Sequence, residues 1–135
     1  NCTEETLYNG NGKIIWKNIY EYDENNNCKT LYSYYSNGEL ESKKSFKYND
    51  KNAVQEIFYY DDEGALEKKE LYRYDSKDVL TEIATYTAQN KLYLRMFFKY
   101  DAKGNVTKIT TYSIAQKFGS TVNELAGMSD YTYQY

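Results

Sequence analysis

Residues 61–86 read DDEGALEKKELYRYDSKDVLTEIATY, and this stretch decides the fold because its pattern recurs along most of the chain. Four such units of 26 residues follow one another at 9–34, 35–60, 61–86 and 87–112, without insertion or deletion. A fixed period of this size is typical of a repeat architecture, in which each unit contacts mainly its neighbours. Two columns of tyrosines mark the period: Tyr8, Tyr34, Tyr60, Tyr86 and Tyr112, and then Tyr22, Tyr48, Tyr74 and Tyr100.

Within each unit, apolar residues are separated by even numbers of positions in short segments rich in β-branched and aromatic side chains. This spacing indicates β-strands, because alternate residues of a strand point to the same face. The columns that carry the pattern are Tyr20, Phe46, Tyr72 and Phe98; Leu31, Ile57, Ile83 and Ile109; and Ile14, Leu40, Leu66 and Leu92.

Two tight turns per unit separate the strands. An Asp or Asn at the first position and a Gly, Asn or Asp at the fourth predict a type I turn followed by a left-handed residue, which is a three-residue hairpin loop with a bulge. One turn begins at Asp23, Asn49, Asp75 and Asp101 and ends at Asn26, Asn52, Asp78 and Gly104. The other ends at Gly12, Gly38, Gly64 and Asn90.

We therefore predict an all-β fold, an antiparallel meander of nine or ten strands in one extended or curled sheet, with residues 1–135 as a single domain. Neither predicted face is continuously apolar, which disfavours a two-sheet sandwich. A closed or coiled barrel-like sheet is the alternative, because long sheets twist and curl. Residues 113–129 leave the repeat pattern and predict an irregular or short helical segment, and residues 130–135 return to strand alternation.

The turn geometry predicts a register in which each turn is closed by a tyrosine opposite a small apolar residue. Tyr22 then faces Cys28, and Tyr100 faces Val106. Because the period is even, we expect even-numbered residues to share one face throughout the repeats. On that face of the middle repeats, charged side chains lie between two tyrosine stripes, and the predicted ligand-binding residues are Tyr60, Lys68, Glu70, Tyr72, Tyr74, Glu82 and Tyr86.

Composition excludes several classes of function. The net charge of -3 gives no support for nucleic-acid binding, and no apolar run is long enough to span a membrane. The chain contains no His, which removes Ser-His-Asp triads and histidine metal sites, and two cysteines do not form a zinc site. We therefore predict a protein that is not an enzyme and needs no metal or cofactor.

The composition suits half-buried surfaces rather than a thick core, and the N-terminus and the cysteines agree with an exported protein. Leu, Ile, Val and Phe together make up less than a fifth of the residues, and 18 tyrosines supply apolar area suited to half-buried surfaces. The first residue is Asn1 rather than Met, which fits the removal of a leader. Cys2 and Cys28 are either bonded, as suits an exported protein, or two separate thiols. A lipid anchor at or before the N-terminus is a further alternative.

The segment YDAKGNV at residues 100–106 resembles the YD repeat of bacterial Rhs-type surface proteins, and residues 22–23 and 74–75 resemble it in the same columns. The segment YSNGEL at residues 35–40 is similar to the MORN-like variant repeats of bacterial exported proteins. Asn49 departs from the YD pattern. The resemblance covers about residues 8–112 and implies secretion or display at the bacterial cell surface. It carries over no catalytic residue, because the family motif is a turn motif.

These observations predict an exported or cell-surface β-repeat module that binds a glycan or a surface protein. The alternative is a structural spacer or assembly subunit that pairs with other chains through its sheet edges. A basic column at Lys17, Lys43, Lys69 and Arg95 could meet an anionic polymer, although lysines on exposed strands also block edge pairing.

Overall fold

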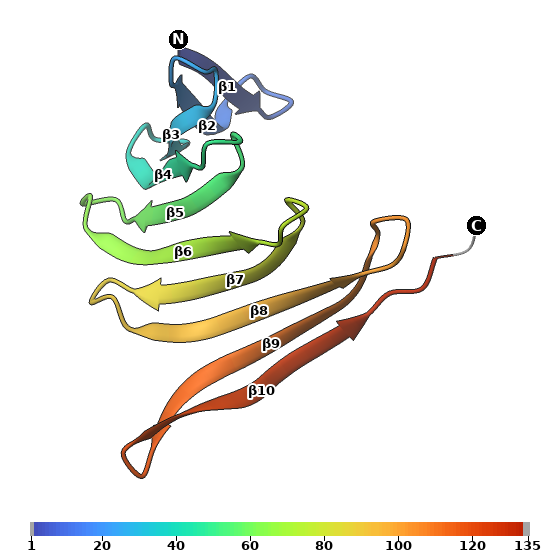
Figure 1. Cartoon of the computed structure of the whole chain (residues 1–135). Coiled ribbons are helices and arrows are strands. Elements are labelled where there is room, and N and C mark those ends of the chain that lie inside the picture. Colours follow the sequence, from blue (N-terminus) through green and yellow to red (C-terminus); the bar gives the residue numbers. More distant parts are fainter. Residues whose placement is uncertain (1, 134–135) are drawn as a thin grey trace. The chain divides into compact units, whose positions relative to one another are not determined.

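The computed structural model of the chain describes residues 2–133, with side chains from residue 3 onward. It confirms the all-β prediction, since the described residues form ten strands and no helix (Figure 1). The strands are β1 Cys2–Tyr8, β2 Ile14–Tyr22, β3 Cys28–Tyr35, β4 Leu40–Tyr48, β5 Val54–Tyr60, β6 Leu66–Tyr74, β7 Leu80–Thr87, β8 Leu92–Tyr100, β9 Val106–Lys117 and β10 Ser120–Asp130.

The ten strands belong to one sheet, and their order in the sheet is their order in the chain. This is an antiparallel meander with β1 and β10 at its edges, so the barrel alternative is wrong. Consecutive strands pair because each is joined to the next by a loop too short for any other connection. The chain divides into two compact units, Asn1–Lys69 and Glu70–Tyr135, and the division falls within β6.

The predicted turn chemistry is confirmed residue by residue. Each predicted left-handed position has a positive φ, including the non-glycine residues Asn26, Asn52, Asp78 and Asn90. The first residue of a turn holds the loop with its side chain. The Asp23 Oδ1 atom accepts hydrogen bonds from the backbone N–H groups of Asn25 at 2.9 Å and Asn27 at 2.8 Å. Asn49, Asp61, Asp75 and Asp101 repeat this pattern at their turns.

The predicted pairs at the turns are also confirmed. Tyr22 lies opposite Cys28, and equivalent pairs are Tyr8–Ile14, Tyr34–Leu40, Tyr48–Val54, Tyr86–Leu92 and Tyr100–Val106. One residue beyond this pair the register shifts, because Glu21 pairs with Thr30 and Lys29 is left over as a bulge. The same shift leaves over Ile15, Glu41, Gln55, Tyr93 and Thr107.

This bulge overturns the prediction that even-numbered residues share one face. Beyond each turn an even residue lies opposite an odd one, as in the pairs Tyr20–Leu31 and Lys44–Tyr59. The even-numbered residues therefore occupy one face in one strand and the other face in the next strand, and after two turns they return to the first face. The closing pair alone does not fix the register of a whole strand, because a bulge moves every residue beyond it to the other face.

The prediction of an irregular or short helical segment at 113–129 is wrong. Residues 106–130 form the hairpin of β9 and β10, and Phe118 and Gly119 are its two turn residues, both with positive φ. The spacing of Ile114, Phe118 and Val122 resembled a helix because the turn lies in its middle. The predicted terminal strand at 130–135 is also wrong for the described part, since β10 ends at Asp130 and residues 131–133 are not strand; residues 134–135 lie outside the described residues.

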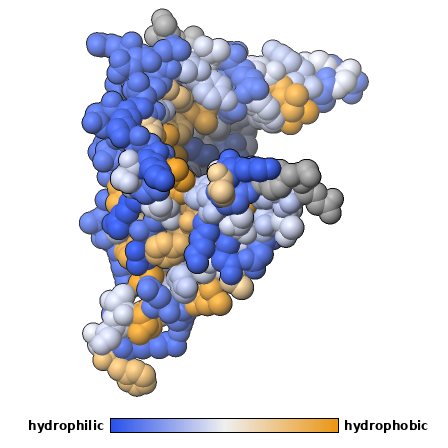
Figure 2. Space-filling view, turned by 45° about the vertical axis from the view of Figure 1, so that its right-hand side comes forward, coloured by the Kyte–Doolittle hydropathy of each residue, from blue (hydrophilic) through white to orange (hydrophobic). Residues whose placement is uncertain are grey.

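The sheet has a thin core. Among the described residues only Thr30, Glu82, Ala84 and Thr85 are buried, and three of these lie on β7. Most tyrosines are half-buried, and the space-filling view shows apolar and hydrophilic side chains interleaved over the visible face (Figure 2). Stability in this fold therefore depends on cross-strand pairs and on satisfied backbone groups more than on a thick apolar layer.

Candidate functional site

In each of the two units, a tyrosine hydroxyl connects one repeat to the repeat before it. The Tyr48 hydroxyl donates to the carbonyl oxygen of Cys28 at 2.8 Å, and in the second unit the Tyr100 hydroxyl donates to that of Leu80 at 2.7 Å. Both carbonyls belong to the first residue of a strand. Tyr133 does the same for Val106 at 3.0 Å, although it follows the repeats. At Tyr48 and Tyr100 the tyrosine thus makes a hydrogen bond that phenylalanine could not make.

In the first unit, the edge formed by two neighbouring turns contains an open groove of about 710 Å³. Its aromatic members are Tyr22, Phe46 and Tyr48. Its polar members are amides and charged groups from the turns and the strands beside them: Asp23, Glu24, Asn25, Asn27, Lys29, Lys47, Asn49, Asn52 and Gln55. Aromatic rings beside several hydrogen-bonding groups are the usual composition of a site for a small polar ligand.

Two asparagines link the turns across this groove, since Asn27 Nδ2 donates to Asn52 Oδ1 at 3.2 Å. The repeat period supplies an internal comparison within the chain. In the second unit the equivalent positions are Val79 and Gly104, which carry no amide, and the turns there have the same geometry. The amide pair is therefore not needed to build the turns.

The charges of the groove balance, since Asp23 and Glu24 are matched by Lys29 and Lys47. A hydrogen bond from the backbone N–H of Asn27 lowers the pKa of the Asp23 carboxyl, so that carboxylate is occupied in holding its turn. Burial raises the pKa of Tyr48, whose hydroxyl is already a donor. The groups left to meet a ligand are mainly neutral amides and ring faces.

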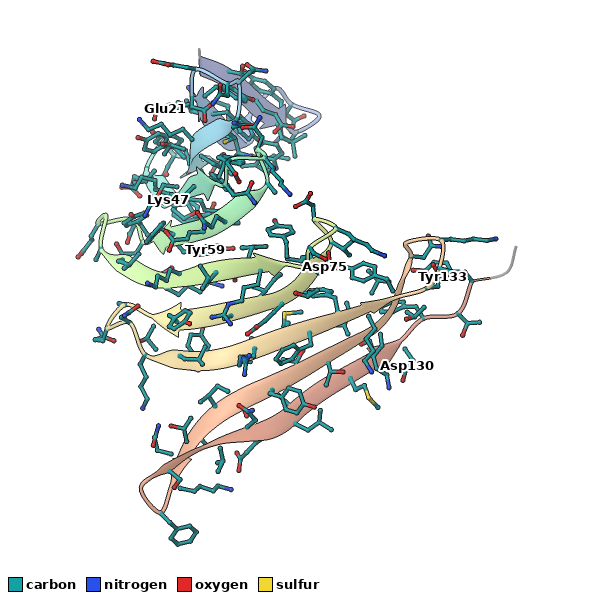
Figure 3. The ribbon with its side chains drawn as sticks, viewed as in Figure 1. Glu21, Lys47, Tyr59, Asp75, Asp130 and Tyr133 are labelled. Atoms are coloured by element: carbon teal, nitrogen blue, oxygen red, sulfur yellow. The ribbon has the colours of Figure 1, made fainter. Side chains whose placement is uncertain are left out.

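In each unit, the predicted binding residues are divided between the two faces of the sheet. Tyr60 and Lys68 belong to the first unit, where each takes part in a cation–π contact. Lys43 Nζ lies 4.1 Å from the centre of the Tyr60 ring, and Lys68 Nζ lies 4.2 Å from that of Tyr59 (Tyr59 is labelled in Figure 3). Tyr60 and Tyr59 are adjacent on β5 and point to opposite faces, which separates Tyr60 from Lys68.

The other predicted residues belong to the second unit and are divided between its two faces. The Tyr72 hydroxyl donates to Glu70 at 3.0 Å on one face of β6. Arg73, on the opposite face of that strand, lies 3.3 Å from Glu82, which places Glu82 away from Glu70. Tyr86 lies opposite Leu92, where the turn between β7 and β8 is closed. Tyr74 is the last residue of β6, and burial raises its pKa.

Glu82 is a structural rather than a ligand-facing carboxylate. It is 6% exposed and bridges two guanidinium groups, at 2.7 Å to Arg95 Nε and 3.3 Å to Arg73 Nη1. The hydrogen bond to Glu82 raises the pKa of Arg95. The Arg95 guanidinium also lies 4.7 Å from the centre of the Phe97 ring. The Phe97 ring packs edge to face against the Tyr112 ring. Each oxygen of the Glu82 carboxylate therefore binds a guanidinium group of the sheet.

The basic column is likewise engaged within the sheet. Lys17 Nζ lies 2.6 Å from Glu4, Lys43 covers Tyr60 and Arg95 binds Glu82.

Cys28 is a free thiol, and burial raises its pKa. Cys28 lies on β3, and β2 separates that strand from β1, where Cys2 lies. The alternative of a Cys2–Cys28 bond is therefore not realised.

Comparison with known proteins supports the fold. No protein-family model matches the chain, and no curated protein matches it in sequence. The crystal structure of a Bacteroides fragilis protein with unknown function is similar, with a TM-score of 0.51 at 12% identity, covering 97% of this chain and 92% of that one. At this identity the likeness shows the fold alone.

A second similar structure is the Tc holotoxin pore of Photorhabdus luminescens, with 13% identity and a TM-score of 0.28, covering 89% of this chain and 10% of that one. That TM-score is too low to carry an argument about fold or function. The resemblance to YD repeats therefore stays a prediction.

No helix of the described residues is both long and apolar enough to cross a membrane, and the same residues contain no cluster of acidic or cysteine side chains that could hold a metal.

Proposed function

We propose that this β-repeat protein is an exported or surface-displayed binding module, and that it binds a glycan in the groove between the turns at 23–27 and 49–53. The observation that carries the proposal is the pair Asn27 and Asn52, joined across the groove although the fold does not require either amide. Residues that a scaffold does not need are the ones available for recognition.

The chemistry of the groove favours a neutral sugar. Amides both donate and accept hydrogen bonds, as sugar hydroxyls do, and tyrosine rings offer flat apolar faces for the C–H side of a pyranose. Matched positive and negative charges give no preference for an anionic polymer. A protein ligand would need a larger complementary surface than one open groove offers. The resemblance to exported repeat proteins supports the proposal that the ligand is met outside the cell.

The test is a glycan array followed by titration calorimetry with the best neutral oligosaccharide. The double variant Asn27→Val/Asn52→Gly removes the amides and keeps the turns, because Val79 and Gly104 occupy the equivalent positions of the second unit, and we expect affinity to fall at least tenfold. Asn37→Ala is the matched control, because Asn37 is an exposed turn asparagine outside the groove. Thermal melts of all three proteins establish that each is folded.

Binding that survives in the double variant would place the site elsewhere on the sheet. A wild-type protein that binds no glycan at millimolar sugar would favour the alternative, a structural spacer. That alternative is favoured by the use of Tyr48 and Tyr100 hydroxyls and of Glu82 within the fold itself. The same array printed with bacterial surface proteins would test for a protein ligand.

A further inference from the structure

The hairpin of β9 and β10 reaches beyond the strand beside it. The pairing of β9 with β8 ends where Ser113 meets Leu94, whereas its pairing with β10 continues to Lys117 and Ser120 (Figure 1). Residues 114–123 are therefore a two-stranded ribbon with a two-residue turn at its tip. Such a ribbon is marginally stable by itself, so the residues at its tip contribute little to the packing of the sheet.

The tip carries a bulky residue where the fold gives no reason for one. Phe118 has a φ of 51°, in the left-handed region that strains large side chains, and the following Gly119 has a φ of 78°. Two-residue turns of this kind prefer Asn or Gly at the first position. The Phe118 side chain is fully exposed, at 107% of its reference area. Both the backbone and the hydration of the ring oppose phenylalanine here, and retained strain of this kind points to a function.

The first unit contains a pocket of a size and composition that suit an aromatic ring. Its volume is about 310 Å³, and its apolar members are Ile14, Ile19, Tyr34 and Tyr35. Ile14 is 38% exposed and Tyr35 is 47% exposed, so the pocket leaves apolar surface in contact with water. It shares no residue with the groove between the turns.

We propose that Phe118 of one copy of this chain inserts into the pocket of a second copy. Insertion removes from water both the exposed ring and the apolar members of the pocket, which stabilises the contact by the hydrophobic effect. Lys17 also lines the pocket, and an ammonium group beside an aromatic ring adds a cation–π attraction. Because Glu4 already neutralises Lys17, the pocket does not require an acidic partner. This contact goes beyond the proposed glycan binding and uses other surfaces.

The symmetry of the contact follows from its parts. The inserting residue and the pocket are different surfaces of the chain, so the contact is heterologous and leaves a free tip and a free pocket at the ends of every dimer. Chains of copies therefore grow with concentration instead of stopping at two. A contact built on one ring is smaller than a stable interface, so we expect a dissociation constant on the order of 100 µM to 1 mM.

Two variants separate the two halves of the contact. Phe118→Asn removes the ring and creates an Asn-Gly turn that fits the backbone, so a loss of association in this variant does not arise from unfolding. Ser36→Arg places a long charged side chain beside the pocket, at a turn residue whose own side chain is exposed. Tyr93→Ser, at an exposed tyrosine outside both surfaces, is the control.

Sedimentation velocity from about 10 µM to 1 mM measures the association. We expect the wild type and the Tyr93→Ser control to shift to larger species with concentration, and each of the other two variants to remain monomeric. An equimolar mixture of Phe118→Asn and Ser36→Arg has one intact pocket and one intact tip, and we expect it to form a one-to-one dimer and nothing larger.

A wild-type protein that is monomeric at 1 mM would overturn the proposal. Association that persists without Phe118 would remove the tip from the contact, and association that persists in Ser36→Arg would remove the pocket. A monomeric protein that sediments with phosphatidylglycerol vesicles, and no longer does so as Phe118→Asn, would show that the tip meets a membrane instead of a second copy. Since the groove is untouched by these variants, glycan binding and self-association succeed or fail separately.

Discussion

The hydroxyl of Tyr100 offers a direct test of how the repeats are held together. Tyr100→Phe keeps the ring and removes only the donor that lies 2.7 Å from the carbonyl oxygen of Leu80. That carbonyl belongs to the first residue of β7, directly after the turn that follows β6. The variant therefore separates the hydrogen bond from the packing of the aromatic column.

The expected loss is about 1 kcal/mol of unfolding free energy, and up to about 3 kcal/mol if the Leu80 carbonyl finds no water, because an unsatisfied buried acceptor costs more than the average bond. For a domain of this size, 1 kcal/mol corresponds to a fall in Tm of roughly 2–8 °C. Tyr48→Phe removes the equivalent bond to Cys28, and we expect a loss of similar size. Tyr35→Phe is the matched control, since Tyr35 is 47% exposed, and its change should stay within about 0.5 kcal/mol.

Urea unfolding followed by circular dichroism measures these changes, and an unchanged slope shows that the same surface is exposed in each protein. The raised pKa of Tyr100, caused first by burial and then by Asp75, adds a signature in pH. A group whose pKa is raised in the folded state loses its contribution as pH rises above the unfolded value near 10. Tyr100→Phe should thus soften the loss of stability above pH 10. Equal midpoints for Tyr100→Phe and Tyr35→Phe would refute the role of the hydroxyl.

Three further predictions follow from other contacts. Asp75→Asn keeps an acceptor for the backbone amides of the turn, and the wild-type pKa of Asp75 is lowered, first by the hydrogen bond from Val79. As pH falls below about 4 and through that lowered pKa, the unfolding free energy of the wild type should fall more than that of this variant. An equal dependence of the two unfolding free energies on pH would contradict this. Glu82→Gln removes the charge that binds two guanidinium groups and should destabilise by about 1–2 kcal/mol in urea unfolding, because Arg73 is 51% exposed and Arg95 is 27% exposed and both keep contact with water; an unchanged midpoint would mean that the ion pairs contribute nothing. Phe118→Asn should stabilise the hairpin by about 1 kcal/mol, seen as a higher Tm, and a lower Tm would show that the ring packs against the protein.

Local chemistry was sufficient to predict the strands and the turns. The residues Asp23, Asn26 and their counterparts every 26 positions each need a particular backbone conformation, and a turn of four residues is decided by those four residues. The pairing of Tyr22 with Cys28 followed from the same turn. The hairpin at 113–129 was not predicted because these residues lie outside the four repeats. Its turn has Phe118 at a position where Asn would have indicated a hairpin.

The faces of the predicted binding residues were decided by contacts outside any single turn. Glu70 and Glu82 have the same parity in the sequence but lie on opposite faces, since Tyr72 binds Glu70 and the next residue of β6, Arg73, binds Glu82. Asn52 was predicted only as a turn residue and Asn27 was not predicted to have a role, although their side-chain amides have no equivalent at Val79 and Gly104. That contrast between repeats was readable in the sequence and is the signal that could have found the groove.

Within the four repeats, the sequence by itself determined the period, the strands and the residues of each turn, since all of these depend on neighbours within a few positions. Only the tertiary structure decided which faces the side chains share, which tyrosine hydroxyl meets which carbonyl and where Glu82 finds its two cations. The physical reason is that a sheet adds its register strand by strand, so a one-residue bulge, invisible in composition and period, reassigns every side chain beyond it.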